Sequence, residues 1–219
     1  MLASHMVRYI LVKKQAIGKI GCFSFYTSKN MTTGEGGMVV TNDKNIYKKL
    51  LSLKSHGNPN ENSPYLYNGI GHNYSMTTMQ AIIGLVQLKK LNILNRYREE
   101  IFKIYLKEFN NLPLILPRIE KNIISAHHLF PILIPEKLKS KRDQIVEALK
   151  SEGVPLCIAY PKPMYDAPQF SKYHNFACPN AENVSSRIIT FFTDKNIPKT
   201  LIPKIKIAME KILNYFLKK

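Results

Sequence analysis

The chain has 219 residues, 45% apolar and 21% charged, a composition that supports a buried core and excludes a disordered chain. No apolar run reaches the roughly 20 residues that span a bilayer, no signal peptide is recognisable, and three scattered cysteines fit a reducing compartment, so we expect a cytoplasmic protein with no membrane partner. The net charge of +17 raises the alternative of a nucleic-acid-binding regulator, but only six of the 32 basic residues are arginine, so we expect solvated lysine faces and no nucleic-acid partner.

The first quarter of the chain predicts two strands, a helix and a long loop. The expected elements are strands at 22–26 and 38–41, a helix at about 44–55 and a loop at 57–73. Asn42 or Asp43 can cap the helix, and Gly57 ends it. The loop is rich in Asn, Gly, Pro and Tyr, and long ordered loops in compact proteins are often functional.

Two separate helices are expected next. Thr77 starts the first, and its apolar residues cover most of its sides, which is typical of a buried helix. Lys89 and Lys90 mark the expected end of this helix. The second helix is expected over about 95–109.

Pro113 and Pro117 indicate a domain boundary near 110–120. Beyond the boundary the expected elements are a strand at 127–134, a helix at 141–151, a strand at 155–160, a helix at 181–189 and a helix at 199–217. The last helix is amphipathic, and we expect its apolar face to dock on its own domain. The order of elements predicts an α/β class with a second, small α/β unit.

The stretch from Gly21 to Gly37 carries the chemistry. Lys29 is a single lysine in a polar loop after a buried strand, and glycines close behind it allow a backbone to approach a ligand. Ser24 lies at the end of that strand, where its hydroxyl could hold a phosphate. A lysine amine must lose its proton before it attacks an aldehyde, and burial with neighbouring cations favours that loss. By residue types alone, a surface lysine in a hairpin loop would be the favoured interpretation.

The whole string closely resembles the lysine segment of the DegT/DnrJ/StrS family, which are pyridoxal-phosphate-dependent aminotransferases of nucleotide-linked keto-sugars. In that family a Phe-Ser-Phe strand leads to the Schiff-base lysine, which is followed by Asn, a Thr-rich pair and Gly-Glu-Gly-Gly. Residues 21–41 are similar to this pattern nearly throughout. The resemblance implies that Lys29 is the Schiff-base lysine and general acid/base, that Ser24 is a phosphate ligand, and that pyridoxal 5′-phosphate is the cofactor.

Residues 69–76 resemble the family's Gly-x-Asn-Tyr-Arg-Met motif. The resemblance implies that Asn73 reaches into the neighbouring subunit's site and binds the cofactor phosphate, so a homodimer is expected. Ser75 stands where the family usually has Arg, which leaves the role of that Arg open here. Candidate substrate contacts are His56, Tyr74 and Tyr160. Further similar segments are Ser55–Gly57, Gln80–Ala81, Gln87–Leu88, Ser125–Phe130, Tyr160–Pro163 and Cys178–Glu182.

The resemblance covers about residues 18–219 and corresponds to the second half of the longer family chains. It implies the C-terminal part of a fold-type I aminotransferase, with 1–110 as the remainder of the large cofactor domain (1–17 atypical) and 111–219 as the small α/β domain. The other half of the family fold supplies an acidic partner for the pyridine nitrogen. We therefore expect a truncated chain, from an internal start, a frameshift or cloning, with little activity alone and a tendency to aggregate or dimerise.

The predicted function is amino transfer from glutamate to a nucleotide-linked keto-sugar in surface polysaccharide or amino-sugar biosynthesis. The alternative is a non-catalytic remnant or dimerising module of the same family. Sugar dehydratases within the family carry histidine at the lysine position, so Lys29 argues against them. The sugar, the nucleotide and the aminated position stay open.

Two histidines and three tyrosines elsewhere in the chain also have roles that need no ligand. His127 and His128 are adjacent on an expected strand and would point to opposite faces, so no metal site is expected. Three tyrosines in or beside the long loop, Tyr65, Tyr67 and Tyr74, either pack the loop or stack on a substrate's nucleotide or sugar, and both interpretations stay open.

Overall fold

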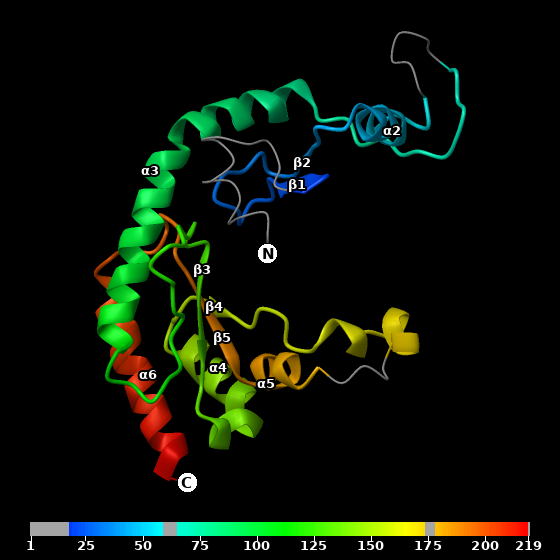
Figure 1. Cartoon of the computed structure of the whole chain (residues 1–219). Helices are drawn as coiled ribbons and strands as arrows, with labels where there is room; N and C mark the ends of the chain where they lie inside the picture. The colour runs from blue at the N-terminus through cyan, green and yellow to red at the C-terminus, as the bar shows by residue number, and fades with distance from the viewer. Residues whose placement is uncertain (1–17, 59–64, 174–177, 219) are drawn as a thin grey trace. The chain divides into compact units, whose positions relative to one another are not determined.

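The computed structural model describes residues 18–58, 65–173 and 178–218 (Figure 1). The chain divides into two compact units. Unit 1 runs up to Asn95 and includes Ile124–Ala126, and unit 2 contains Arg96–Ile123 and His127–Lys219. This division falls inside a helix, whereas the expected domain boundary lies at 110–111, and the assignment of large and small domains stays a prediction.

Unit 1 contains a two-stranded antiparallel sheet of β1 (Gly21–Ser24) and β2 (Gly37–Val40). Gly21 lies opposite Val40, so the strands form the two sides of the lysine-bearing connection. Helix α2 (Lys44–Lys54) follows, and the Asp43 carboxylate caps it by accepting hydrogen bonds from the first-turn backbone amides. Both expected strands and the capped helix are confirmed to within one residue at each end, except that β1 ends two residues early, at Ser24. The expectation of a buried first strand is wrong, because Cys22 is exposed and Phe23 and Ser24 are half-buried.

The two helices expected at 77–90 and 95–109 are one helix, α3 (Thr78–Phe109) (Figure 1). The prediction of a break at Lys89 and Lys90 is therefore wrong. Residues 89–95 contain neither glycine nor proline, and nothing in them interrupts the backbone hydrogen bonds of a helix. A buried stripe continues through the expected break at helical spacing: Leu91, Asn95, Arg98, Phe102, Tyr105 and Phe109.

The expectation that the first half of α3 is buried is also wrong for this chain. Met79 and Leu85 are 77% and 62% exposed, and Ile82 is more than half exposed. One side of this half of α3 does contact the lysine loop of the same unit. A Cβ on Gly84 would lie 3.0 Å from Thr33 Cγ2, so glycine permits the close approach. A helix that is apolar on most sides is buried only where other segments cover those sides. The rest of unit 1 covers one side of this half of α3.

The buried core of unit 1 is small. Phe25, Met31 and Leu91 are each less than 8% exposed and form one cluster, with Phe23 packed against it. The cluster therefore joins the strand end, the lysine loop and α3. A core of this size contributes a few side chains' worth of burial, roughly 1.5–3 kcal/mol each.

Unit 2 contains a three-stranded antiparallel sheet with the order β3-β5-β4. The strands are β3 (Leu129–Leu133), β4 (Leu156–Cys157) and β5 (Ile188–Phe192). The helix expected at 181–189 is wrong at its C-terminal end, because α5 (Pro179–Arg187) stops where β5 begins. Residues 188–192 read Ile-Ile-Thr-Phe-Phe, and a short continuous apolar run rich in β-branched and aromatic residues is typical of a strand buried in the middle of a sheet.

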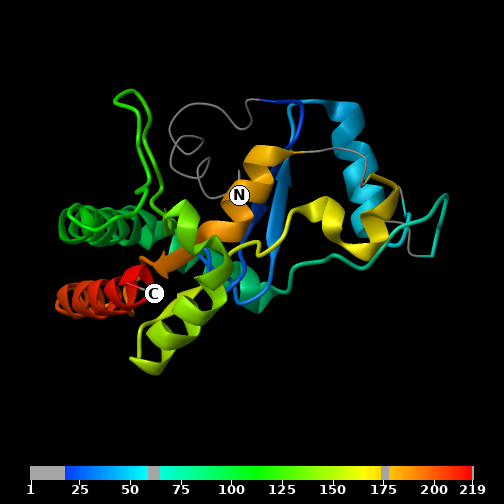
Figure 2. The ribbon, with the colours of Figure 1, turned by 90° about the horizontal axis from the view of Figure 1, so that it is seen from below.

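Two helices pack on this sheet and on each other, α4 (Arg142–Ser151) and α6 (Leu201–Lys218) (Figure 2). The predicted docking face of α6 is confirmed, since Ile205, Met209 and Ile212 are buried in the core of unit 2. The remaining elements are short 3₁₀ helices, η1 (Glu136–Lys141), η2 (Met164–Asp166) and η3 (Pro168–Tyr173). In the described ranges, no helix is both long and apolar enough to cross a membrane.

Candidate functional site

Lys29 lies in a connection of twelve residues, 25–36, whose base is closed by hydrogen bonds. The Phe25 amide donates to Gly36 O over 2.9 Å, which extends the pairing of β1 and β2 by one step. Thr33 N donates to Phe25 O over 2.9 Å, and the Thr32 hydroxyl donates to the same oxygen over 3.0 Å. The connection is therefore an ordered loop with a narrow neck.

Lys29 itself is half-buried near the far end of this loop. Its backbone amide donates to Tyr26 O over 3.0 Å, which makes a tight turn over residues 26–29. Ser24 is the last residue of β1 and is also half-buried, and its Oγ lies 3.4 Å from the Tyr26 amide that points to it. Ser24 therefore lies at the neck of this loop, and Lys29 lies within the loop, five residues further along the chain.

A second group of predicted residues meets at the ends of the long loop. An isolated antiparallel bridge pairs Ser55 with Asn73, and His56 N donates to His72 O over 3.0 Å. The Tyr74 ring stacks on the His72 ring at 5.0 Å between centroids. His56, Asn73 and Tyr74 are thus neighbours on the backbone scaffold, with all three side chains exposed.

Tyr160 belongs to unit 2 and lies just before the expected proline-flanked loop. The strand predicted over 155–160 ends at Cys157, and Tyr160 has a φ of +59°, a backbone conformation that an aromatic residue rarely adopts. Its side chain is 55% exposed. Burial raises the pKa of the nearby Cys157 thiol, which agrees with a packing role for that cysteine.

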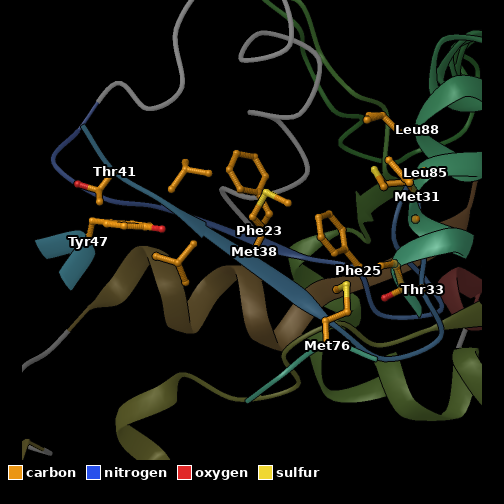
Figure 3. A pocket seen from close by; sticks show the side chains of 14 residues that line it. Phe23, Phe25, Met31, Thr33, Met38, Thr41, Tyr47, Met76, Leu85 and Leu88 are labelled. Atoms are coloured by element: carbon orange, nitrogen blue, oxygen red, sulfur yellow. The ribbon is translucent and has the colours of Figure 1, made fainter. Parts of the chain in front are cut away.

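Two hollows lie in unit 1, and they differ in chemistry. The first, of about 570 Å³, is lined mainly by apolar side chains of the hairpin and α3, among them Phe23, Met38, Leu85 and Leu88 (Figure 3). Lys29 does not line it, and its walls suit apolar packing rather than an anionic ligand. This hollow is therefore not the candidate site.

The second hollow, of about 500 Å³, has polar walls that include Lys54, His56 and Ser75. Tyr65 and Tyr67 also line it, and their side chains are 84% and 55% exposed. Both rings are therefore accessible from the hollow, and the two interpretations of these tyrosines stay predictions. A lysine, a histidine and hydroxyl groups form a set of donors suited to an anion.

Sequence reasoning missed one pair of residues next to Lys29. Asn30 is 4% exposed, and its Nδ2 donates to Asn95 Oδ1 and to Ala126 O, each over 2.8 Å. The backbone carbonyl of Glu35 accepts hydrogen bonds from the Thr33 hydroxyl and from Gln80 Nε2. A polar residue inside an apolar helix stripe, as at Asn95, is the signal that could have found the pair.

The fold, the loop and the sequence all match one protein family. The model of the DegT/DnrJ/EryC1/StrS aminotransferase family matches residues 12–204. The chain belongs to this family. The predicted family and the predicted cofactor of the family, pyridoxal 5′-phosphate, are confirmed. The predicted fold, α/β and of the fold-type I aminotransferase class, is confirmed over about half the length of the solved family members.

Relatives of the chain include named sugar aminotransferases. An uncharacterized protein of Methanocaldococcus jannaschii is 40% identical over 81% of this chain and 50% of its own length. The UDP-N-acetyl-3-dehydro-alpha-D-glucosamine 3-aminotransferase of Acidithiobacillus ferrooxidans is 30% identical over 91% of this chain and 52% of its own length. The solved Helicobacter pylori aminotransferase of pseudoaminic acid biosynthesis is 29% identical, with a TM-score of 0.83 over 94% of this chain and 56% of that one. The chain spans about half the length of the curated relatives it matches.

Proposed function

We propose that this chain is the lysine-bearing part of a pyridoxal-phosphate-dependent aminotransferase that acts on a nucleotide-linked keto-sugar, with glutamate as the amino donor. The observation that carries the proposal is Lys29 on an ordered loop with a closed neck, with the Ser24 hydroxyl at that neck. The names of relatives from several bacteria, which include UDP- and GDP-sugar enzymes, support the substrate class.

The donor set at the hairpin end fits the cofactor. An amine and a hydroxyl lie on one short segment, as a ligand with an aldehyde and a phosphate requires. When bound, pyridoxal 5′-phosphate supplies a carbon that binds amines and a ring that accepts electrons from the substrate carbon. Lys29 Nζ would bind the aldehyde carbon, give it up to the incoming amine and then carry a proton at the substrate carbon, while Ser24 Oγ would donate to a phosphate oxygen.

Predicted residues at the ends of the long loop also receive roles in this proposal. Asn73 would donate its amide hydrogens to the cofactor phosphate of a second copy, which makes the proposed enzyme a homodimer. Lys54 and His56 line a hollow suited to the diphosphate of a sugar nucleotide, and the exposed tyrosine rings beside it would stack on the base. The domain assignment, with 1–110 as cofactor domain and 111–219 as small domain, is part of the same proposal.

A covalent trapping experiment tests this proposal. The purified chain is incubated with pyridoxal 5′-phosphate, reduced with borohydride and digested, and the modified lysines are identified by peptide mass. We expect the wild-type adduct to form mainly on Lys29, with little on the exposed lysines. In Lys29→Ala, we expect only the low, even modification of the exposed lysines. Glutamate added before the reduction should remove the Lys29 adduct of the wild type. Modification spread evenly over the lysines in both proteins would contradict the proposal.

The second candidate, a dimerising module without turnover, is favoured by one observation. Clustered exposed apolar side chains mark interaction surfaces, and the first half of α3 exposes several large ones, which include Met79, Ile82, Ile83, Leu85, Val86 and Leu88. A chain that dimerises but neither traps the cofactor at Lys29 nor responds to glutamate would support this candidate over the enzyme.

A further inference from the structure

We propose that Asn30 and Asn95 are positioning residues that hold Lys29 in place for the proposed amine chemistry. The inference rests on the proposed function of Lys29 and deepens it. Asn30 follows Lys29 directly in the chain, so their Cα atoms are about 3.8 Å apart. Any element that holds Asn30 therefore also holds the backbone from which the Lys29 side chain extends.

The contacts of Asn30 define its orientation. Its Nδ2 group has two hydrogens, and both are used, one on Asn95 Oδ1 and one on Ala126 O, each over 2.8 Å. A carbonyl oxygen such as Ala126 O can only accept, so a flipped amide would place oxygen against oxygen. The Asn30 side chain therefore has one favourable orientation in this site.

The two acceptors lie far from Lys29 in the sequence and on different segments. Asn95 belongs to α3 and follows Asn30 by 65 residues, and Ala126 follows Asn30 by 96 residues. Met31, the next residue of the loop, is 7% exposed and packs in the same cluster as Leu91 of α3. The loop tip is thus fastened to α3 by a polar contact and an apolar contact on successive residues.

Asn95 is a poor choice for stability alone. It is 2% exposed, and within the described part of the chain its Nδ2 has no hydrogen-bond partner. A buried donor without a partner destabilises the folded state, whereas an aliphatic residue on this stripe would not. The useful part of the side chain is Oδ1, which accepts from Asn30. This asymmetry favours a role in holding the loop over a role in filling the core.

Asn30 and Asn95 therefore narrow the region that the Lys29 amine samples. A reacting amine gains from a fixed approach, and displacements of about 1 Å at a reactive group cost large factors in rate. Without the Asn30 contacts, the tip beyond the Phe25 neck would keep its turn and the apolar contact of Met31 with Leu91, but would lose its polar attachment to α3. Lys29 would then react more like an ordinary exposed lysine.

The test measures selectivity rather than turnover. Wild type, Asn30→Ala, Asn30→Asp, Asn95→Ala and Asn95→Asp are trapped with pyridoxal 5′-phosphate and borohydride, and the Lys29 adduct is divided by the mean adduct on exposed lysines of the same protein. Asn92→Ala, an exposed asparagine of α3, is the matched control. Thermal unfolding and circular dichroism of each variant report whether the fold is retained.

We expect Asn30→Ala, Asn30→Asp and Asn95→Ala to lower this ratio about tenfold at unchanged circular dichroism, because each loses the buried hydrogen bond between the two side chains. Asn95→Asp retains an oxygen acceptor for Asn30 Nδ2, but it also replaces the donor that lacks a partner with a carboxylate oxygen at a site that is 2% exposed. Its ratio, measured once the variant is shown to be folded, should stay within about twofold of wild type. Asn92→Ala should behave as wild type.

Three results would overturn the inference. One is a wild-type ratio in folded Asn30→Ala. The second applies if Asn30→Ala does not fold: it is the same Lys29 adduct ratio in folded Asn95→Ala and folded Asn95→Asp, although only Asn95→Asp retains the acceptor. A wild-type chain with no preference for Lys29 removes the proposed function and, with it, the inference, so the two failures are distinguishable.

Discussion

Ser55 and Asn73 face each other in an antiparallel bridge that closes the long loop of unit 1. Hydrogen bonds on either side continue the pairing, from His72 N to Leu53 O over 2.8 Å and from Tyr74 N to Lys54 O over 2.9 Å. The bridge holds His56 and Asn73 on adjacent stretches of backbone, although the sequence separates them by a loop. The proposed phosphate ligand and the proposed substrate contact therefore depend on the same closure.

Gly57→Ala should open this closure. Gly57 has a φ of +79°, and a Cβ there would lie 1.9 Å from Gly69 O, so the backbone has to move. We expect at least tenfold faster hydrogen exchange at the amides of His56, His72 and Tyr74, equivalent to about 1.4 kcal/mol or more of lost local stability. Gly69→Ala is the control, because a Cβ at Gly69 would meet no atom within 4 Å. Equal exchange in both variants would contradict the role of Gly57.

Replacing Ile82 and Leu85 by serine should weaken self-association. The two side chains are 56% and 62% exposed in the single chain, so the double variant should fold with little change in stability. Sedimentation velocity should show a larger monomer fraction than wild type at the same concentration. Ile207→Ser on α6, where the side chain is 63% exposed, is the control. A similar shift in the control would mean that the apolar surface of α3 has no special role.

Arg187→Met should destabilise unit 2. The Arg187 side chain is 7% exposed, its Nε donates to Ile134 O over 2.8 Å, and its guanidinium also bonds Glu136 and Asn183. Methionine fills similar volume but leaves the Ile134 carbonyl without this donor, at a cost of about 1–3 kcal/mol in urea-induced unfolding. Glu136→Gln removes only a carboxylate that is 59% exposed, and we expect less than about 1 kcal/mol. Equal losses would contradict this account.

Tyr165 should ionise at unusually high pH. Its hydroxyl donates to Glu182 Oε1 over 2.5 Å, and this hydrogen bond to a carboxylate raises the pKa of Tyr165 to about 12. Because the folded pKa lies above the ordinary value of 10.0, the contribution to stability is present below pH 10 and is lost as the pH rises through about 12. Tyrosinate absorbance of Glu182→Gln minus wild type should show one tyrosine titrating earlier. Superimposable titrations would exclude the hydrogen bond.

Local signals in the sequence were sufficient for several elements. The Phe-Ser-Phe segment and Gly-Met-Val-Val segment predicted both strands around Lys29, and Asp43 predicted the start of α2, because side-chain alternation and capping are short-range effects. The amphipathic spacing of α6 predicted its buried face for the same reason. These elements required no knowledge of a partner segment.

Features that depend on contacts between distant segments could not be predicted from these local signals. The continuity of α3 through Lys89 and Lys90 goes with a buried stripe that runs from Leu91 to Phe109, whereas charged residues at a helix surface resemble a helix end when only the local sequence is considered. The central position of β5 depends on its pairing with β3 and β4, so local signals place only its first two residues, 188 and 189, and place them at the end of a helix. The exposure of Leu85 depends on which neighbours surround the helix, and composition does not specify them.

The candidate site likewise has features that the local sequence specifies and features that depend on the folded chain. Residue order places Lys29 after a strand and Ser24 at its end, and a resemblance in twenty-one consecutive residues, 21–41, identifies the family, because strand, turn and glycine positions are encoded locally. The attachment of Asn30 to Asn95 and Ala126, and the pairing of Ser55 with Asn73, exist only after distant segments meet. Those contacts come from the packing of α3 against the loop, since a buried amide adopts the one orientation that satisfies its donors.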